Sequence, residues 1–180
     1  MNNRSRIKRQ SILGLPVIDG STGKRLGVVK DLYVNGQSAK LDGFYVTDKG
    51  WGNKTIGIPF DDVTIGNDAI IAEGNLSAVS RHSELNRGEL EKLLGKKVVR
   101  EDGLELGYIS DIILDPLTGR IDGLELSESV IGDLMSGRRI LPYEPHEYTN
   151  GDILVISMEQ AERIISSNRG IKNIFFSKLE

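Results

Sequence analysis

Short apolar runs, separated by polar and glycine-rich turns, make up most of the chain. Eight of them stand out, at residues 28–34, 41–46, 55–59, 69–72, 109–114, 121–126, 140–143 and 153–157. Runs of this length at spacings near ten residues are typical of strands in a β-sandwich or barrel, not of alternating strands and helices. The pattern therefore predicts a mainly β fold.

The two halves of the chain repeat the same pattern. A shift of 80 residues superimposes matching pairs: Leu26-Gly27 on Leu106-Gly107, Asp31 on Asp111, Lys40 on Arg120, and Asp42-Gly43 on Asp122-Gly123. The shift grows to 83 at Ile58-Pro59 and Leu141-Pro142, because the second copy has a longer middle loop, residues 127–139. Each copy of about 65 residues is only marginally stable alone, so the two copies are expected to pack together.

Two segments outside the repeats have helical signals. Residues 86–89 resemble a capping box, with leucines behind it and Gly95 as the stop. Residues 157–160 form a better box, which predicts a helix from 158 to Gly170. An apolar tail follows at 174–176, which either covers its own domain or docks elsewhere.

The ordered set of motifs resembles the PRC-barrel family. The motifs are Leu-Gly-x-x-x-Asp, an Asp-Pro-x-Thr-Gly-Arg turn, an Asp-Gly step and a closing Ile/Leu-Pro-aromatic. The second copy has all of them, whereas the first has residues 35–39 in place of the Asp-Pro turn. The family includes the cytoplasmic domain of the photosynthetic reaction centre H subunit and the C-terminal domain of the ribosome maturation factor.

This resemblance implies two tandem, small, six-stranded β-barrels. The expected parts are a basic N-terminal arm (1–10), a first barrel (11–74), a linker with a short helix (75–92), a second barrel (93–157) and a C-terminal helix with an apolar tail (158–180). It also implies a non-enzymatic assembly or adaptor surface. The chain looks most like the stand-alone two-barrel proteins of bacteria.

The composition indicates where in the cell the protein is expected to be located. The longest apolar run, residues 12–18, contains Gly14 and Pro16 and is too short to span a membrane. The basic start mimics the beginning of a signal peptide, but the apolar run is short and no small-residue cleavage site follows. The chain has no cysteine, which agrees with the expected cytoplasmic location.

Charge is unevenly distributed. Residues 1–90 carry 12 basic and 10 acidic residues, a net of +2, whereas residues 91–180 carry 11 and 16, a net of −5. The basic arm holds Arg4, Arg6, Lys8 and Arg9. It is interpreted either as a flexible arm that touches phosphate or an anionic membrane, or as a solvated tail. The bulk charge does not encode a general affinity for nucleic acid.

The side chains that carry catalysis or bind metals are scarce. His82 and His146 lie in different copies, and neither has a second histidine or a cysteine nearby. Gly20-Ser-Thr-Gly23-Lys24 is too short between its glycines for a phosphate loop, so a turn is expected. We therefore expect no catalytic residue, no metal and no cofactor.

Repeated positions are expected to be structural. Four acids recur between the copies, namely the pairs Asp31 and Asp111, and Asp42 and Asp122; the second pair precedes Gly43 and Gly123. Duplicated positions usually reflect what a fold requires. The favoured interpretation is that these carboxylates accept hydrogen bonds from nearby backbone amides, and the alternative is paired acid–base groups.

The loops are the remaining candidates for binding. Trp51 lies between glycines in the first middle loop, either as a lid on its own barrel or as an anchor for a partner. Met135, Arg138 and Arg139 occupy the longer second loop. Our hypothesis is an adaptor that binds another protein through these four residues. The alternatives are an RNA- or ribosome-associated factor, and a protein that contacts membranes peripherally or joins a photosynthetic complex.

Overall fold

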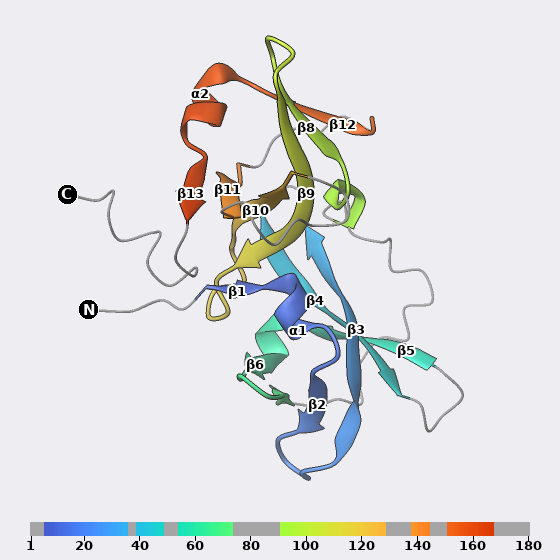
Figure 1. Ribbon diagram of the computed structural model, residues 1–180. Coiled ribbons are helices and arrows are strands. Elements are labelled where there is room, and N and C mark those ends of the chain that lie inside the picture. The colour runs from blue at the N-terminus through green and yellow to red at the C-terminus, as the bar shows by residue number, and fades with distance from the viewer. Residues whose placement is uncertain are drawn as a thin grey trace, which may run out of the picture.

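The computed structural model describes residues 6–35, 39–48, 54–73, 91–128, 138–144 and 151–167. Two β-sheets, one from each copy of the repeat, lie one above the other in Figure 1. Helices within the described residues are short. The mainly β architecture predicted from the apolar runs is therefore confirmed.

The first sheet has six strands in the order β5-β4-β3-β2-β7-β6. Its strands are β2 (Pro16–Asp19), β3 (Arg25–Asn35), β4 (Lys40–Asp48), β5 (Lys54–Pro59), β6 (Val63–Ile65) and β7 (Ile70–Ala72). Neighbours are antiparallel except β2 and β7, which are parallel. Helix α1 (Arg9–Ile12) precedes β2, and the 3-10 helix η1 (Phe60–Asp62) joins β5 to β6.

The second sheet follows the path β12-β8-β9-β10-β11-β13, and β1 adds to it beside β9. Its strands are β1 (Ile7–Lys8), β8 (Lys97–Arg100), β9 (Glu105–Leu114), β10 (Ile121–Ser127), β11 (Arg138–Pro142), β12 (Ile153–Ile156) and β13 (Ile165–Ser167). The 3-10 helix η3 (Glu91–Leu93) precedes β8.

Five strands have the same arrangement in both sheets. The series β2, β3, β4, β5 and β7 corresponds to β8, β9, β10, β11 and β12, including the parallel pair β2–β7 and β8–β12. Strands β1, β6 and β13 are two or three residues long, too short to give a recognisable alternation. The sequence therefore predicts four of the five shared strands in each copy, and it misses β2, β8 and the added strands.

The two sheets meet at the equivalent residues Lys40 and Arg120, which form an antiparallel bridge. The hydrogen bonds beside it are reciprocal. The Leu41 amide donates to the Gly119 carbonyl at 2.8 Å, and the Ile121 amide donates to the Ala39 carbonyl at 2.9 Å. One buried apolar cluster contains residues of both sheets, so the copies pack together as expected.

The repeated Leu-Gly motif has a backbone cause. Gly27 has a φ of +156° and Gly107 a φ of +120°, a region that L side chains rarely adopt. A Cβ atom at Gly27 would lie 2.6 Å from the Thr47 carbonyl oxygen, and one at Gly107 would collide with the carbonyl oxygen of Ser127. Each copy therefore requires glycine where its long strand crosses the next one.

The C-terminal helix is shorter than predicted. Helix α2 (Met158–Glu162) begins with the predicted capping box, in which the Gln160 amide donates to Ser157 Oγ at 3.1 Å. It ends at Arg163 because residues 165–167 instead pair with β11 as strand β13. Gly170, the tail at 174–176 and the first predicted box at 86–89 lie outside the described residues.

Candidate functional site

The N-terminal cations lie between the two barrels. Arg6 forms an ion pair with Asp122, Lys8 with Glu125, and Arg9 with Asp31. The three cationic side chains are only 12–16% exposed. The prediction of a flexible, solvent-borne arm is therefore wrong for residues 6–9, because β1 pairs with β9 and turns these side chains toward carboxylates; Arg4 lies outside the described part of the chain.

Four consecutive residues contact both barrels; we call residues 6–9 the basic segment. In β1, Ile7 lies opposite Leu114 and Lys8 opposite Ile113. Alternation along an extended chain places positions 6 and 8 on one face, from which both reach acids of β10. Helix α1 begins at Arg9, whose guanidinium donates to Asp31 of the first barrel at 2.9 and 2.8 Å.

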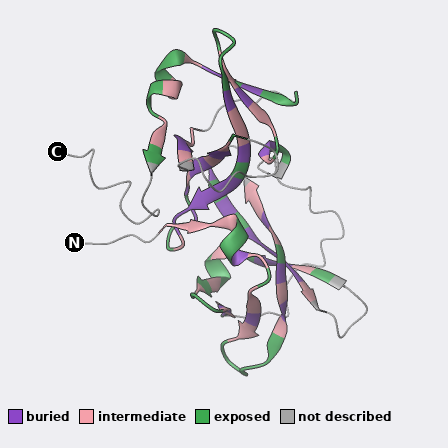
Figure 2. Cartoon of the chain, viewed as in Figure 1, coloured by how far each residue is buried: buried purple, intermediate pink, exposed green. Residues whose placement is uncertain are grey.

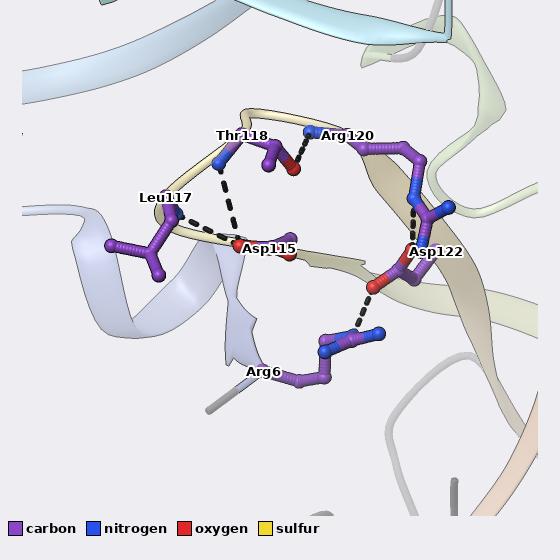
Figure 3. Close-up of polar contacts among 6 residues, drawn as sticks. All are labelled: Arg6, Asp115, Leu117, Thr118, Arg120 and Asp122. Carbon is purple, nitrogen blue, oxygen red and sulfur yellow. Dashed lines mark hydrogen bonds and ion pairs between the residues drawn. The ribbon is translucent and has the colours of Figure 1, made fainter. Parts of the chain in front are cut away.

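Asp122 is held between two guanidinium groups (Figure 3). One carboxylate oxygen pairs with Arg6, and the other accepts a hydrogen bond from Arg120 Nε at 2.8 Å. The Asp122 side chain is 5% exposed, whereas that of Arg120 is 55% exposed. Asp122 is therefore shielded from solvent, and of its two guanidinium partners Arg120 is the one that extends into solvent.

The Asp-Pro-x-Thr-Gly-Arg turn folds beside this cluster (Figure 3). Buried Asp115 accepts hydrogen bonds from the amides of Leu117 at 2.9 Å and Thr118 at 3.4 Å. Gly119 ends the turn with a φ of +68°, and a Cβ atom there would lie 3.0 Å from Phe60 of the first barrel. The motif thus shapes a turn that lies against the other barrel.

Asp31 and Asp111 share a local role. Each accepts a hydrogen bond from the amide of the following residue, Leu32 at 2.7 Å and Ile112 at 2.8 Å. This is the backbone role that the sequence analysis favours for the repeated acids. Asp111 also accepts from the Gln10 amide at 3.3 Å.

Asp111 is a buried carboxyl group with an acidic neighbour. Its side chain is buried and lies directly opposite Glu125 in the β9–β10 ladder. Burial raises the pKa of Asp111, while the amides of Ile112 and Gln10 and the charge of Lys8 act in the opposite direction. Since like charges across a strand pair repel each other, the Lys8 ammonium stabilises this part of the sheet.

The Asp-Gly step differs between the copies. Asp42 is exposed, and partial desolvation together with the charge of Asp61 raises its pKa. A Cβ atom at Gly43 would collide with the Ile58 carbonyl oxygen and the Tyr33 ring. The same atom at Gly123 would first meet a side-chain methyl group of Ile140, at 2.7 Å. Both glycines allow close packing against the next strand.

The residues predicted to bind a partner are not brought together among the described residues. Trp51 and Met135 lie outside them, as do His82 and His146. Arg138 and Arg139 were expected in the long loop, but both lie in β11, where Arg139 donates to the Leu106 carbonyl at 2.6 Å. The loop is shorter than expected because β11 extends to pair with β13.

The turn at residues 20–24 is not built as a phosphate loop. Asp19 accepts hydrogen bonds from the amides of Ser21 at 2.8 Å and Thr22 at 3.1 Å, which is an Asp-initiated turn. Hydrogen bonds from Ser21 and Thr22 lower the pKa of Asp19 to about 2. The amides are thus occupied by the chain's own carboxylate, as the turn interpretation expects.

Strand β12 carries an exposed apolar surface that was not predicted from the sequence. Ile153 is 47% exposed and Val155 63% exposed, while the alternate residues Leu154 and Ile156 are buried. Met158, at the start of α2, is 49% exposed. Figure 2 shows the exposed stretches of β12 and α2 at one end of the second barrel. The sequence of this strand is apolar at every position, although only the residues on one face of the strand contact the core.

The described residues show no group of three or more metal-ligating side chains. Nor is any helix among them long and apolar enough to cross a bilayer.

Comparison with known families agrees with the repeat. The sequence profile of the PRC-barrel domain matches residues 5–77 and again residues 87–161. No curated protein matches the chain. The first match begins at residue 5 and so includes the basic segment, in agreement with the place of β1 and α1 in the fold. The chain belongs to the PRC-barrel domain family and carries two of these domains in tandem.

Proposed function

We propose that this tandem PRC-barrel protein is a non-enzymatic adaptor that binds another protein. The observation that carries the proposal is the apolar surface of β12, formed by Ile153 and Val155; Met158, at the start of α2, is a further exposed apolar side chain. Exposed apolar side chains that cluster on one element are typical of interaction surfaces, because their burial against a partner is favourable.

Contacts around this surface hold it in a defined shape. Val155 lies beside Val99 of β8 in the parallel ladder, which extends the apolar character across two strands. The amide of Met158 donates to Glu101 Oε1 at 3.1 Å, and the Glu101 amide donates to the Ile156 carbonyl at 2.9 Å. The start of α2 is thereby tied to the β8–β9 turn, so a partner would meet a surface that is already formed.

The test is a comparison of two variants of the full chain. Ile153→Ser with Val155→Ser removes the apolar surface, and Leu117→Ser removes an apolar side chain that is 77% exposed in the turn between β9 and β10. Tagged proteins are used to capture partners with and without nuclease. A near-stoichiometric protein that survives nuclease should be lost with the double variant and kept with Leu117→Ser. Equal capture by both variants would sink the proposal for this surface.

The loop residues stay separate predictions. Replacing Trp51 by Ala should weaken partner binding without a large fall in melting temperature if Trp51 is an anchor. The RNA- or ribosome-linked alternative predicts strongly salt-dependent binding that fades when residues 1–9 are removed. That alternative gains no support from Arg6, Lys8 and Arg9, whose charges are already paired with carboxylates.

A further inference from the structure

The second barrel presents an acidic surface beside a stretch of strand edge that the N-terminal segment covers instead of β8. Strand β8 covers one edge of β9 only from Glu105 to Tyr108, and β1 pairs with the same strand farther along, at Ile113 and Leu114. Next to this stretch lie three acids that we call the acidic strip. They are Asp111, Asp122 and Glu125.

We propose that the acidic strip and the adjoining edge of β9 form a docking site for a basic, extended protein segment, which residues 6–8 of the chain occupy as an intramolecular ligand. Addition of a strand to a sheet edge is a common way to bind peptides, since backbone hydrogen bonds give affinity and alternate side chains give specificity. Here Arg6 and Lys8 are the alternate side chains, and Asp122 and Glu125 receive them.

Asp122 and Glu125 of the acidic strip each require a cationic partner. Asp111 lies opposite Glu125, and Asp122 is nearly buried, so without a basic segment these carboxylates repel each other in a poorly solvated setting. Asp122 meets a planar guanidinium and Glu125 an ammonium. A ligand with basic residues two positions apart in an extended chain fits both.

Residues 6–8 have few backbone contacts with the acidic strip and the β9 edge. Their ladder with β9 consists of two residue pairs, whereas the firm anchor is Ile12 in α1, which is 1% exposed in the apolar core. Residues 6–8 can therefore leave the strip while Ile12 keeps the chain attached to the apolar core that both barrels share. The inference deepens the proposed function but does not use the β12 surface, so each can fail without the other.

The experiment uses a fluorescent synthetic peptide with the sequence of residues 1–9 and three full-length receptors. They are the wild type, Arg6→Glu with Lys8→Glu, and a control, Lys24→Glu with Lys30→Glu, which makes the same charge change at exposed positions. Fluorescence anisotropy gives the dissociation constants. A tethered segment competes at about millimolar effective concentration, so releasing it should tighten peptide binding about tenfold or more relative to wild type.

The control receptor should bind the peptide no better than the wild type does. A peptide carrying glutamate in place of its Arg6 and Lys8 should not bind any receptor. Equal affinity for the released and control receptors, or no binding to either, would overturn the proposal. Ile153→Ser with Val155→Ser should leave peptide binding unchanged, which separates this result from the test of the β12 surface.

Folding of the released receptor is checked by circular dichroism. If it does not fold, Arg6→Gln with Lys8→Gln takes its place, because a neutral amide adds no repulsion. A second readout uses the wild type itself. Excess unlabelled peptide should raise the hydrogen-exchange rate of the Lys8 amide region at least severalfold as the tethered strand is displaced. An unchanged rate at a peptide concentration that saturates the released receptor would count against the proposal.

Discussion

Equivalent acids in the two barrels have different partners. Asp31 receives both arms of the Arg9 guanidinium, whereas its counterpart Asp111 receives backbone amides and lies opposite Glu125. Asp42 is exposed, whereas its counterpart Asp122 is nearly buried between Arg6 and Arg120. Duplication has thus kept the backbone role of Asp31 and Asp111, while the charge partners of all four acids have diverged around the N-terminal segment.

The outer strands differ in the same way. In the first barrel, β7 lies between β2 and β6, and its outward residue Ile71 is half-buried. In the second barrel, the equivalent strand β12 is the last in the path of the described residues, and Val155 is 63% exposed. One copy has therefore become the covered barrel, and the other carries the surfaces that we assign to binding.

The largest difference between the copies is expected at the Asp-Gly steps. Gly43→Ala should lower the free energy of unfolding by about 3 kcal/mol, because its methyl group meets the backbone of Ile58 and the Tyr33 ring. Gly123→Ala should cost about 1 kcal/mol, since the Ile140 side chain can shift. Urea unfolding gives both values. A larger cost at Gly123 would show that the second barrel is the tighter one.

A smaller difference is expected at the two guanidinium pairs. Arg9→Ala should lower the free energy of unfolding by about 3 kcal/mol, because it removes the bidentate partner of a largely buried carboxylate. Arg6→Ala should cost about 1–2 kcal/mol, since Asp122 keeps Arg120. Denaturant melts of the two variants decide the order, and Lys24→Ala, at an exposed position, serves as the neutral control. Equal losses would mean that Arg120 does not compensate.

The pH dependence of stability should separate Asp111 from Asp19. Burial raises the pKa of Asp111, so the folded state holds this proton more tightly than the unfolded chain does. The resulting stabilisation is complete below the ordinary carboxyl pKa and is lost as pH rises through the raised one. Asp111→Asn should therefore gain stability relative to the wild type between about pH 3 and pH 7.

Asp19→Asn should behave oppositely in the same thermal melts. The pKa of Asp19 is lowered to about 2, so its contribution is present above the ordinary pKa and is lost as pH falls through the lowered one. The variant should be less stable than the wild type at neutral pH and equal to it near about pH 2. Parallel curves for the two variants would contradict the assigned burial of Asp111.

The smallest effect is expected on the outer strands. Val155→Ser should change the free energy of unfolding by less than about 0.5 kcal/mol, because its side chain already faces solvent. Ile71→Ser, at the equivalent position of the covered strand, should cost about 1–2 kcal/mol. Chemical denaturation of both variants makes the comparison. A large loss for Val155→Ser would indicate that this side chain belongs to the core.

The repeat and the turn chemistry made much of the fold predictable. Leu-Gly at 26–27 and 106–107, and the Asp115 turn, encode backbone geometry that one residue type satisfies, so they are readable without a structure. The basic segment was not readable, because the partner of Arg6 lies more than a hundred residues away in the chain. The sequence shows that Arg6 is charged, but not that its ion-pair partner is Asp122 of the second barrel.

The β12 surface was hidden for a related reason. Ile153, Leu154, Val155 and Ile156 are all apolar, and local sequence cannot say that one face of this strand meets the core and the other meets solvent. The exposure depends on how many strands lie beyond β12, which is a property of the assembled sheet. Likewise, the end of α2 depends on the pairing of β13 with β11, a contact between distant segments.

The reciprocal bonds at Lys40 and Arg120 have a consequence for how such a chain can arise. Residue 39 contacts residue 121 and residue 119 contacts residue 41, which is the isologous pattern of a two-fold symmetric dimer. A single barrel of this kind has the backbone groups to pair with an identical copy of itself. Fusing two copies on one polypeptide keeps that contact while removing its dependence on concentration. It also frees each half to change without its twin.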